Sequence, residues 1–534
     1  MTTAGAAPSA GLREAYAVGE RHEAGLDRTA RELGSHFTPS DVAETLLRLA
    51  LEAWQGPGHP VVCDPSCGGG VFLVAAAEWL LRAGAPVERI VDELVVGADI
   101  DAGAVRATAE ALAVWAAGAG YRGRPSPRVV VADALHDALP EEGAVDIVVG
   151  NPPFQGQLAA RTARAAAARE RLRERYGAAA GGYVDVAALF QLRGLELVRT
   201  GGVVALLQPR SFLVARDAEA VRSAVVARSS PVAVWMPGEQ LFAANVDVCA
   251  PVLLATPTTA TTVDVLGGRD ATLRHGSVTL DLLAATPTWS SVWATAHGVP
   301  QVTPAPGAWR LGDLAVATAG FRDQYYGLIP HLRAERPVSA ARVATTAMVD
   351  PATCAWGERD VTIARERWTT PWLDREALGA ADERLAAWVA RLAVPKVLVA
   401  TQTRVIEAVA DDAGDLVPLT PLLAVLPMAD VGVRHLEAAL LAPAATAWAL
   451  WRFGGAGMSS GALKLAARQV VEIPVPTSRR HWDDAVAMLS TERPPSTSAW
   501  HEIGRTLNAA WGVEDDALVD WWASRLPANR VSGS

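Results

Sequence analysis

The sequence predicts an α/β fold with a mainly parallel sheet, a second mixed α/β domain and a helical C-terminal end. Two observations predict the sheet. Between about residues 60 and 255, short apolar runs alternate with helix-length segments, and a run of glycines follows the first apolar run. This alternation is typical of βαβ units, in which each helix returns the chain to the same edge of a sheet covered on both faces. A length of 534 residues is enough for about two to four domains.

The elements of the first domain are expected in a regular order. The pair Ser40-Asp41 can cap a helix over Val42–Trp54. Later helices are expected from the glycine turn to about Leu81, over Ala102–Trp115 and near Val184–Val198. The expected strands are Val61–Cys63, Leu94–Ala98, Arg128–Ala132, Val145–Val149, Gly202–Leu207, Val232–Met236 and Val246–Ala255.

Changes in this pattern predict the domain boundaries. Residues 1–35 are polar and rich in Ala, Glu and Arg, which indicates a helical extension. The first domain spans residues 36–260 and ends where Thr/Pro-rich sequence begins. Residues 300–480 contain Pro and Gly interruptions and short strands such as Lys396–Ala400, which indicates a second mixed α/β domain. Residues 481–534 indicate a helical C-terminal segment with several Trp.

Composition excludes several classes of protein. The N-terminus lacks an apolar core flanked by basic residues, and no apolar run reaches the ~18–20 residues that a membrane span needs. We therefore expect a cytoplasmic protein with no membrane partner. The four cysteines have no ligand-like Cys/His clustering around them, so neither a disulfide framework nor a metal site is expected.

The net charge of −10 is unevenly distributed along the chain. Residues 152–230 carry twelve Arg and six acidic side chains, a local excess of +6. Such a segment can form a phosphate-facing surface in an acidic chain, because salt screens surface charge beyond ~8–10 Å. Arg161 and Arg164 are the candidate contacts. A solvated helix with internal Glu–Arg pairs explains the pattern equally well.

A glycine loop follows the first expected strand. Glycines at a strand-to-helix turn let the backbone approach a ligand, and such turns bind nucleotide-like cofactors at the carboxyl ends of parallel strands. The spacing is not G-x-G-x-x-G and no Gly-Lys-Ser/Thr is present, so a phosphate site is not expected. The acid at the strand end suits a cationic ligand instead, such as the amino and sulfonium groups of S-adenosylmethionine. The expected cofactor contacts are Asp64, Pro65, Cys67, Gly68, Gly70 and Phe72.

Acidic residues also end the next two expected strands. A carboxylate at the tip of the second strand, Asp99, can bind both ribose hydroxyls. Asp133 ends the third strand, where it could accept from an adenine amino group. The neighbouring Ile100 and Ala134 are included in this expected cofactor site. Each acid alone would be explained as a helix cap or a solvated turn, but three at successive strand ends favour a cofactor.

The fourth expected strand leads into Asn151-Pro152-Pro153-Phe154. Two prolines remove two backbone donors and fix two φ angles, which predicts a rigid loop. The Asn151 amide oxygen and the Pro152 carbonyl could then accept from both N–H groups of an exocyclic amine and favour attack by its lone pair on a methyl group. Phe154 offers a stacking face, which for a base is worth ~1–3 kcal/mol. A proline-punctuated turn without chemistry is the alternative.

Together these motifs resemble the γ-class, Taq-type adenine-N6 DNA methyltransferases of restriction–modification systems. The similarity covers roughly residues 30–256 and also includes Asp185…Phe190, Gly201–Leu207 and Gly238-Glu239-Gln240-Leu241-Phe242. The resemblance implies that His36, Phe37, Thr38 and Pro39 hold the methionine part of S-adenosylmethionine and that Phe242 contacts a flipped adenine. Phe154 stands where Tyr is commoner in the family, which keeps the stacking face and removes a hydroxyl.

The second half is similar to target-recognition domains of such enzymes and of type I specificity subunits. The similarity rests on Trp309–Ala315, with its Leu-Gly-Asp-Leu, and on Val471–Pro476, with its Ile-Pro-Val-Pro. It implies double-stranded DNA as partner, with Arg322, Tyr325, Lys396 and Arg404 as candidate contacts. A second domain that clamps the duplex suits an enzyme that must extrude its base. No nuclease motif is recognisable, so cleavage would need a restriction or defence partner protein.

The leading interpretation is therefore site-specific methylation of adenine in duplex DNA at the bacterial nucleoid, with S-adenosylmethionine as donor. An RNA-base or protein-glutamine N-methyltransferase is an alternative, because these chemistries also use Asn-Pro-Pro-aromatic loops. A second alternative is an inactive DNA-binding subunit of a defence complex. The recognition sequence and the oligomeric state are not predicted.

Overall fold

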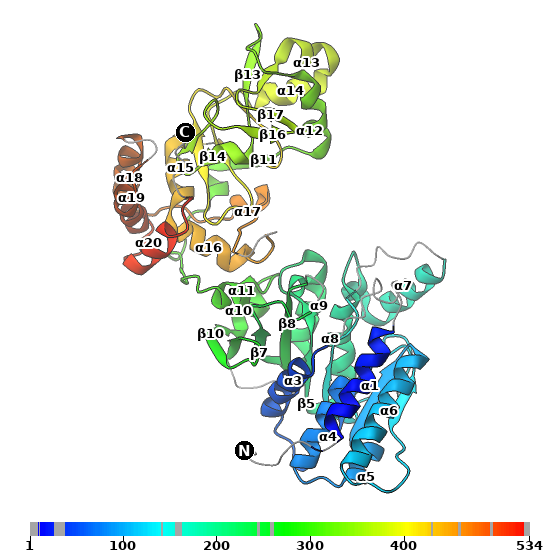
Figure 1. The fold of residues 1–534 in the computed structure, drawn as a ribbon. Helices are drawn as coiled ribbons and strands as arrows, with labels where there is room; N and C mark the ends of the chain where they lie inside the picture. Colours follow the sequence, from blue (N-terminus) through cyan, green and yellow to red (C-terminus); the bar gives the residue numbers. More distant parts are fainter. Residues whose placement is uncertain are drawn as a thin grey trace. The chain divides into compact units, whose positions relative to one another are not determined.

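The computed structural model describes residues 9, 11–25, 38–139, 142–154, 163–242, 246–256, 261–428, 431–457, 461–491 and 495–527. The chain divides into two compact units, Met1–Gly298 and Val299–Ser534 (Figure 1). Each has its own sheets and helices, and each is described by itself.

Five neighbouring strands of the first unit form the predicted parallel sheet. They lie in the order β3-β2-β1-β4-β5, and each pairs in parallel with the next. This order is that of a doubly wound α/β sheet, which confirms the predicted fold class. The strands are β1 (Val62–Asp64), β2 (Val95–Asp99), β3 (Arg128–Val131), β4 (Val145–Gly150) and β5 (Val198–Leu206).

Antiparallel and mixed pairings extend the sheet beyond β5. Strand β8 runs antiparallel to both β5 and β7, β9 pairs in parallel with β7, and β10 ends the sheet. These strands are β7 (Ser230–Met236), β8 (Val248–Leu254), β9 (Thr262–Gly267) and β10 (Leu273–Thr279), with the short β6 (Gln208–Pro209) beside β8. The sheet therefore continues past the boundary expected at residue 260. The sequence did not reveal β10 because most of its residues are exposed and it lacks an apolar run.

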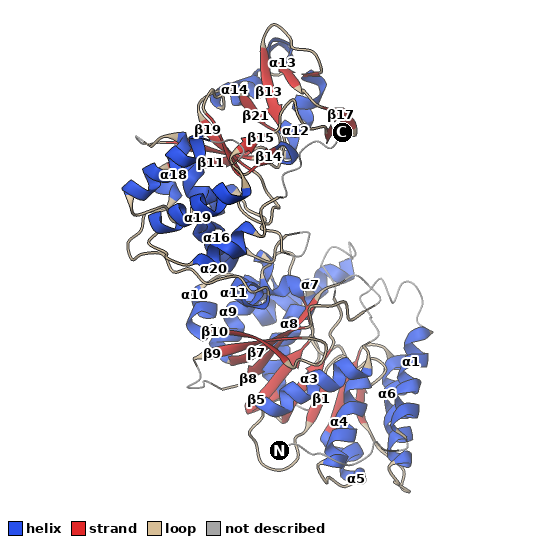
Figure 2. Ribbon diagram, turned by 60° about the vertical axis from the view of Figure 1, so that its left-hand side comes forward, coloured by secondary structure: helices blue, strands red, loops and turns tan. Residues whose placement is uncertain are grey.

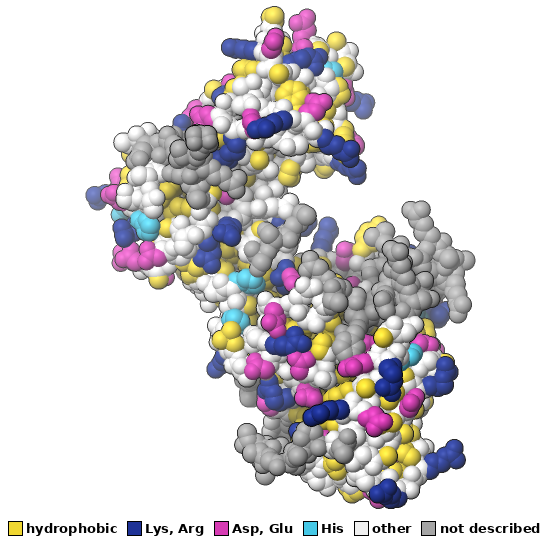
Figure 3. Space-filling model, in the orientation of Figure 1, with side chains coloured by type: hydrophobic (Ala, Val, Ile, Leu, Met, Phe, Trp, Pro, Cys, Tyr) yellow, Lys and Arg dark blue, Asp and Glu magenta, His cyan; other side chains and the backbone are white. Residues whose placement is uncertain are grey.

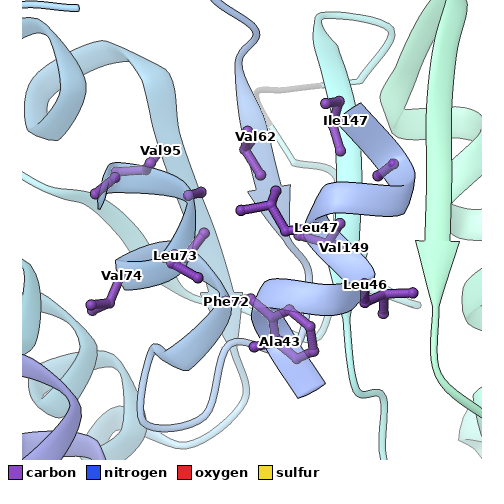
Figure 4. Packing of buried hydrophobic residues seen from close by; sticks show 14 of the residues in the cluster. Ala43, Leu46, Leu47, Val62, Phe72, Leu73, Val74, Val95, Ile147 and Val149 are labelled. Atoms are coloured by element: carbon purple, nitrogen blue, oxygen red, sulfur yellow. The ribbon is translucent and has the colours of Figure 1, made fainter. Parts of the chain in front are cut away.

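Helices cover both faces of this sheet (Figure 2). Buried residues from α1 (Leu12–Ala24), α3 (Ser40–Ala53), α4 (Val71–Arg82) and α6 (Ala102–Gly118) share one core with the strands. On the opposite face, α8 (Val186–Leu197) and α9 (Glu219–Arg228) pack together. Figure 4 shows Leu46 and Leu47 of α3 in the same core as Ile147 and Val149 of β4. The remaining helices are α5 (Val87–Arg89), α7 (Ala163–Tyr176), α10 (Leu280–Ala285) and α11 (Ser290–Ala296).

The second unit contains two small sheets and two hairpins. One sheet is antiparallel, in the order β11-β22-β19-β20, and the other is mixed, in the order β12-β18-β13-β21. The strands are β11 (Ala315–Ala319), β12 (Leu332–Arg333), β13 (Ala340–Ala344), β14 (Val349–Asp350), β15 (Thr353–Cys354), β16 (Val361–Ile363), β17 (Glu366–Trp368), β18 (Trp372–Asp374), β19 (Lys396–Val399), β20 (Ala408–Asp411), β21 (Leu416–Pro418) and β22 (Leu423–Pro427).

Helices of the second unit gather toward its C-terminal end, as the sequence predicts. They are α12 (Arg322–Leu328), α13 (Arg375–Ala381), α14 (Glu383–Arg391), α15 (Val433–Leu441), α16 (Pro443–Phe453), α17 (Ala467–Val470), α18 (Arg479–Thr491), α19 (Thr497–Ala510) and α20 (Asp516–Ala523). The two motifs singled out in this half lie together, because Leu311 N–H donates to the Ile473 carbonyl at 2.8 Å and Val475 N–H to the Trp309 carbonyl at 2.9 Å. Among the described residues, no helix combines the length and hydropathy of a membrane span.

Candidate active site

The candidate site lies at the carboxyl ends of β1 and β4. The strand order changes direction between these two neighbours, since β1 continues to β2 and β3 on one side and β4 continues to β5 on the other. Ligands of open α/β sheets bind in the crevice outside the carboxyl ends at such a switch point. Asp64 is the last residue of β1, and Asn151 directly follows β4. The fold therefore brings these two residues, far apart in sequence, to the same end of the sheet.

The glycine loop forms a network with the acids at the strand ends. Ser66 N–H donates to Asp64 Oδ1 at 3.0 Å, and Gly68 N–H donates to Asp99 Oδ2 at 2.9 Å. Gly68 and Gly70 have φ angles of 51° and 88°, a region that favours glycine. Their backbone conformation therefore explains both glycines, and the loop holds two carboxylates at the carboxyl ends of β1 and β2.

The carboxyl groups here are unusually reluctant to ionise. Burial raises the pKa of Asp64 to about 8, and repulsion from Asp99 adds to this effect. Burial also raises the pKa of Asp99. Among the described residues, no basic side chain forms an ion pair with either acid. A cationic ligand would favour the ionised forms of both, so the electrostatics suit the predicted cofactor.

A third acid, Glu23 of α1, reaches the same loop and was missed by the sequence analysis. Its carboxylate accepts a hydrogen bond from the backbone of Gly69, and burial raises its pKa to about 7. The helix comes this close because Gly19 packs on Gly69, where an added Cβ on Gly19 would lie 2.5 Å from the Gly69 carbonyl oxygen. Glu23 lies in a polar helix far from the glycine loop in sequence, so no local signal identifies it.

At the end of the third strand, the acid that was predicted to bind adenine already has partners within the protein. The Asp133 carboxylate accepts from Leu135 N–H at 3.1 Å and lies 2.8 Å from His136 Nδ1. Ala134 is buried, and its carbonyl accepts from Arg193 Nε at 2.6 Å. In contrast, the Ile100 side chain is 71% exposed beside Asp99, which leaves an apolar surface for a ligand to cover. Acceptance of an adenine amino group by Asp133 therefore stays a prediction. The same carboxylate also contacts His136.

The Asn-Pro-Pro-Phe loop presents an unused acceptor. Asn151 Nδ2 donates to Thr38 Oγ1 at 3.0 Å, whereas Asn151 Oδ1 is buried and has no hydrogen-bond partner among the described residues. Buried polar atoms are usually paired, so this oxygen at the switch point is an acceptor available to a ligand donor. Phe154 lies next to Phe242, with ring centroids 6.5 Å apart and an interplanar angle of 77°. The structure therefore brings together the two aromatics that the resemblance assigned to the base.

Several predicted cofactor residues lie in the protein interior or outside the described residues. The Phe72 side chain is 2% exposed and packs in the core with α3 (Figure 4), so only its backbone is available to the loop. Cys67 is 3% exposed, and its thiol accepts from Thr108 Oγ1 at 3.6 Å. Pro65 is buried, and Pro39 directly precedes α3. His36 and Phe37 lie outside the described residues.

The predicted DNA contacts need one clear correction. Lys396 is fully buried, and its Nζ lies 2.6 Å from Asp411 Oδ2 in an ion pair across β19 and β20. Lys396 is therefore a core residue and not a DNA contact. Tyr325 is half-buried against the second core, and its hydroxyl accepts from Ala364 N–H at 3.2 Å, which indicates a structural role. Arg322 and Arg404 are exposed.

The basic segment of the first unit is described only in part. Arg161 and the side chain of Arg164 lie outside the described residues. Within α7, Arg173 pairs with Glu170 at 3.6 Å, as expected of a solvated helix, and Arg175 lies 2.6 Å from Glu196.

Comparisons with known proteins relate the first unit to DNA methylases. Residues 17–267 match the family model described as N-6 DNA methylase. The chain is 32% identical over 134 residues to the type II methyltransferase M.MamI of Microbacterium ammoniaphilum, a match that covers 23% of this chain and 35% of that protein. Residues 17–267 of the first unit are thus similar to N-6 DNA methylases, which supports the resemblance to adenine-N6 DNA methyltransferases of restriction–modification type. The γ-class order stays a prediction, and the chain spans about a third of this relative's length.

Two solved structures overlap with much of the chain. The type IIG restriction endonuclease BpuSI gives a TM-score of 0.47 at 12% identity, over 97% of this chain and 68% of that one. The DrdV–DNA complex gives a TM-score of 0.48 at 12% identity, over 90% of this chain and 59% of that one.

Proposed function

We propose that this protein transfers a methyl group from S-adenosylmethionine to the exocyclic amine of an adenine flipped out of duplex DNA. The observation that carries the proposal is Asn151 Oδ1, a buried acceptor with no partner among the described residues, at the switch point of a sheet whose residues are similar to N-6 DNA methylases. An exocyclic amine supplies the donor that this oxygen lacks.

The residues around the glycine loop fit the proposed cofactor. Asp64, Asp99 and Glu23 all have raised pKa values, and a bound cation would stabilise their ionised forms. When bound, S-adenosylmethionine supplies a sulfonium that carries a transferable methyl group. Asp64 and Glu23 would face the cationic part, Asp99 would bind ribose hydroxyls, and the exposed Ile100 would cover the base.

The chain's own residues would accept hydrogen bonds from the substrate amine and orient it for the transfer. Asn151 Oδ1 and the Pro152 carbonyl would take the two N–H groups of the amine, which localises its lone pair on nitrogen. The two prolines hold both acceptors in place, because they fix the backbone φ angles of the loop. Phe154 and Phe242 would provide the apolar contact that keeps an extruded base in the pocket.

Duplex DNA is the proposed partner, and the second unit offers a suitable surface. At the start of α12, Phe321 and Tyr326 are 74% and 55% exposed, and the Arg322 guanidinium lies 5.5 Å from the centroid of the Tyr326 ring. Arg322 and Arg404 form no ion pair among the described residues, so both are available to phosphates or base edges. The protein would act at the nucleoid, and any cleavage would come from a restriction or defence partner.

This function is tested with the Asn151→Ala variant. Transfer of labelled methyl to duplex DNA should be lost, while binding of S-adenosylmethionine measured by calorimetry should survive. Transfer at the normal rate by the variant would show that the assigned role is wrong. Transfer by the wild type to ribosomal RNA or release factor, but not to duplex DNA, would favour the alternative substrates.

A further inference from the structure

We propose that Thr38 is a positioning residue that holds the Asn151 amide in place, with its Nδ2 end bound and its Oδ1 end left for the substrate. The inference rests on the proposed function and assigns Thr38 a role beyond the cofactor contact that the family resemblance implies. It starts from one hydrogen bond, in which Asn151 Nδ2 donates to Thr38 Oγ1 at 3.0 Å.

An amide side chain has a donor end and an acceptor end, and only one of them suits an amine substrate. With Nδ2 held by Thr38, Oδ1 is left unpaired and can accept from an amine N–H. Turned by 180°, the amide would present its own N–H groups to the N–H groups of the substrate. The hydrogen bond to Thr38 holds the amide in the orientation that the structure shows, with Oδ1 left for an amine N–H, before any substrate binds.

The position of Thr38 is well fixed by the fold. The side chain is 4% exposed and lies two residues before α3, whose first helical residue is Ser40. Helix α3 packs on β4 through a shared core (Figure 4). This packing brings Thr38 to Asn151 across 113 residues of sequence. Among the described residues, Thr38 supplies the one acceptor recorded for Asn151 Nδ2.

The test compares Thr38→Val with Thr38→Ser. Valine keeps the size of threonine and removes the hydroxyl, whereas serine keeps the hydroxyl. We expect Thr38→Val to lower the single-turnover rate of methyl transfer about tenfold to hundredfold at saturating cofactor and DNA. Thr38→Ser should stay within about threefold of the wild type, since one hydrogen bond of this kind is kept. The control is Thr45→Val, which removes a buried hydroxyl from within α3 and should leave the rate unchanged.

Two results would overturn the inference. One is a normal transfer rate in Thr38→Val. The other is a loss confined to cofactor affinity, which would make Thr38 a cofactor contact only. A second readout separates this inference from the proposed function: exchange of the Asn151 side-chain amide protons, followed by NMR without substrate. The Nδ2 proton that faces Thr38 should exchange slowly in the wild type and in Thr38→Ser and faster in Thr38→Val, and equal exchange in all three would refute the positioning role.

Discussion

The Asp64 carboxylate packs directly against the backbone of Gly150, where an added Cβ would lie 2.6 Å from Asp64 Oδ1. These residues end the neighbouring strands β1 and β4 and stand on either side of the switch point. The first acid of the proposed cofactor site therefore packs closely against the residue before Asn151. A substitution at the end of one strand should therefore displace the residue at the end of the other.

Replacing Gly150 with Ala should impair cofactor binding. The new methyl group overlaps the buried carboxylate of Asp64, so Asp64 or the glycine loop must shift. We expect the Kd for S-adenosylmethionine to rise by about tenfold or more, an order of magnitude that corresponds to ~1.4 kcal/mol. Gly379→Ala, at a glycine with open space around it, is the matched control. Unchanged affinity in Gly150→Ala would contradict the close packing.

Cofactor binding should strengthen as pH rises. The pKa of Asp64 is raised to about 8 in the free protein, so its carboxyl is protonated at pH 6 and ionised at pH 9. A cation binds the ionised form better, so affinity should increase by roughly tenfold per pH unit at most, and level off above about pH 8. The pKa of Glu23, about 7, adds to the rise at its lower end.

Calorimetry in buffers of different ionisation enthalpy measures this proton release directly. Binding near pH 7 should release protons in the wild type and fewer in Asp64→Asn. Affinity and proton release that do not change between pH 6 and pH 9 would show that the acids do not face the cationic part of the cofactor.

The buried pair Lys396–Asp411 should matter for stability and not for DNA binding. Lys396→Met leaves Asp411 buried without its cation, a loss of ~3–5 kcal/mol in the free energy of unfolding. Gly414 and Leu416 N–H groups also donate to Asp411 and would soften the effect. Urea denaturation measures the loss, and Lys396→Met/Asp411→Asn should recover part of it. A folded Lys396→Met protein of normal stability but weaker DNA binding would restore Lys396 as a DNA contact.

The surface at α12 should contribute to DNA affinity. Basic and acidic side chains are interspersed over the visible face of each unit in Figure 3, so we test particular side chains of this surface. Arg322→Ala should weaken binding to duplex DNA and reduce the salt dependence by about one counterion. Phe321→Ala should weaken binding with little change in salt dependence. Arg480→Ala, another exposed arginine of the second unit, is the control. Equal affinities in all four proteins would exclude this surface.

The local sequence predicted those site residues that lie at the ends of strands. Asp64, Asp99 and Asn151 each follow an apolar run, so their place at one edge of a parallel sheet follows from the βαβ pattern. Contacts between distant segments could not be predicted in this way. Glu23 reaches the glycine loop only because α1 packs there, and Thr38 meets Asn151 only through the docking of α3.

The burial of Lys396 also could not be predicted from its local sequence. A lysine after Val394-Pro395 at the start of a short strand resembles an exposed end residue. Its burial depends on the register of β19 and β20, which places Lys396 directly opposite Asp411. Unless that register is known, the local sequence around Lys396 fits a buried ion pair and a DNA contact equally well.

The central claim is tested most directly by identifying the methylated product. Duplex DNA incubated with the purified protein and methyl-labelled S-adenosylmethionine is digested to nucleosides, which are separated and analysed by mass spectrometry. We expect label in N6-methyladenine, at a defined sequence, from the wild type and none from Asn151→Ala. Label in cytosine or in no DNA nucleoside, from a protein that binds both S-adenosylmethionine and DNA, would contradict it.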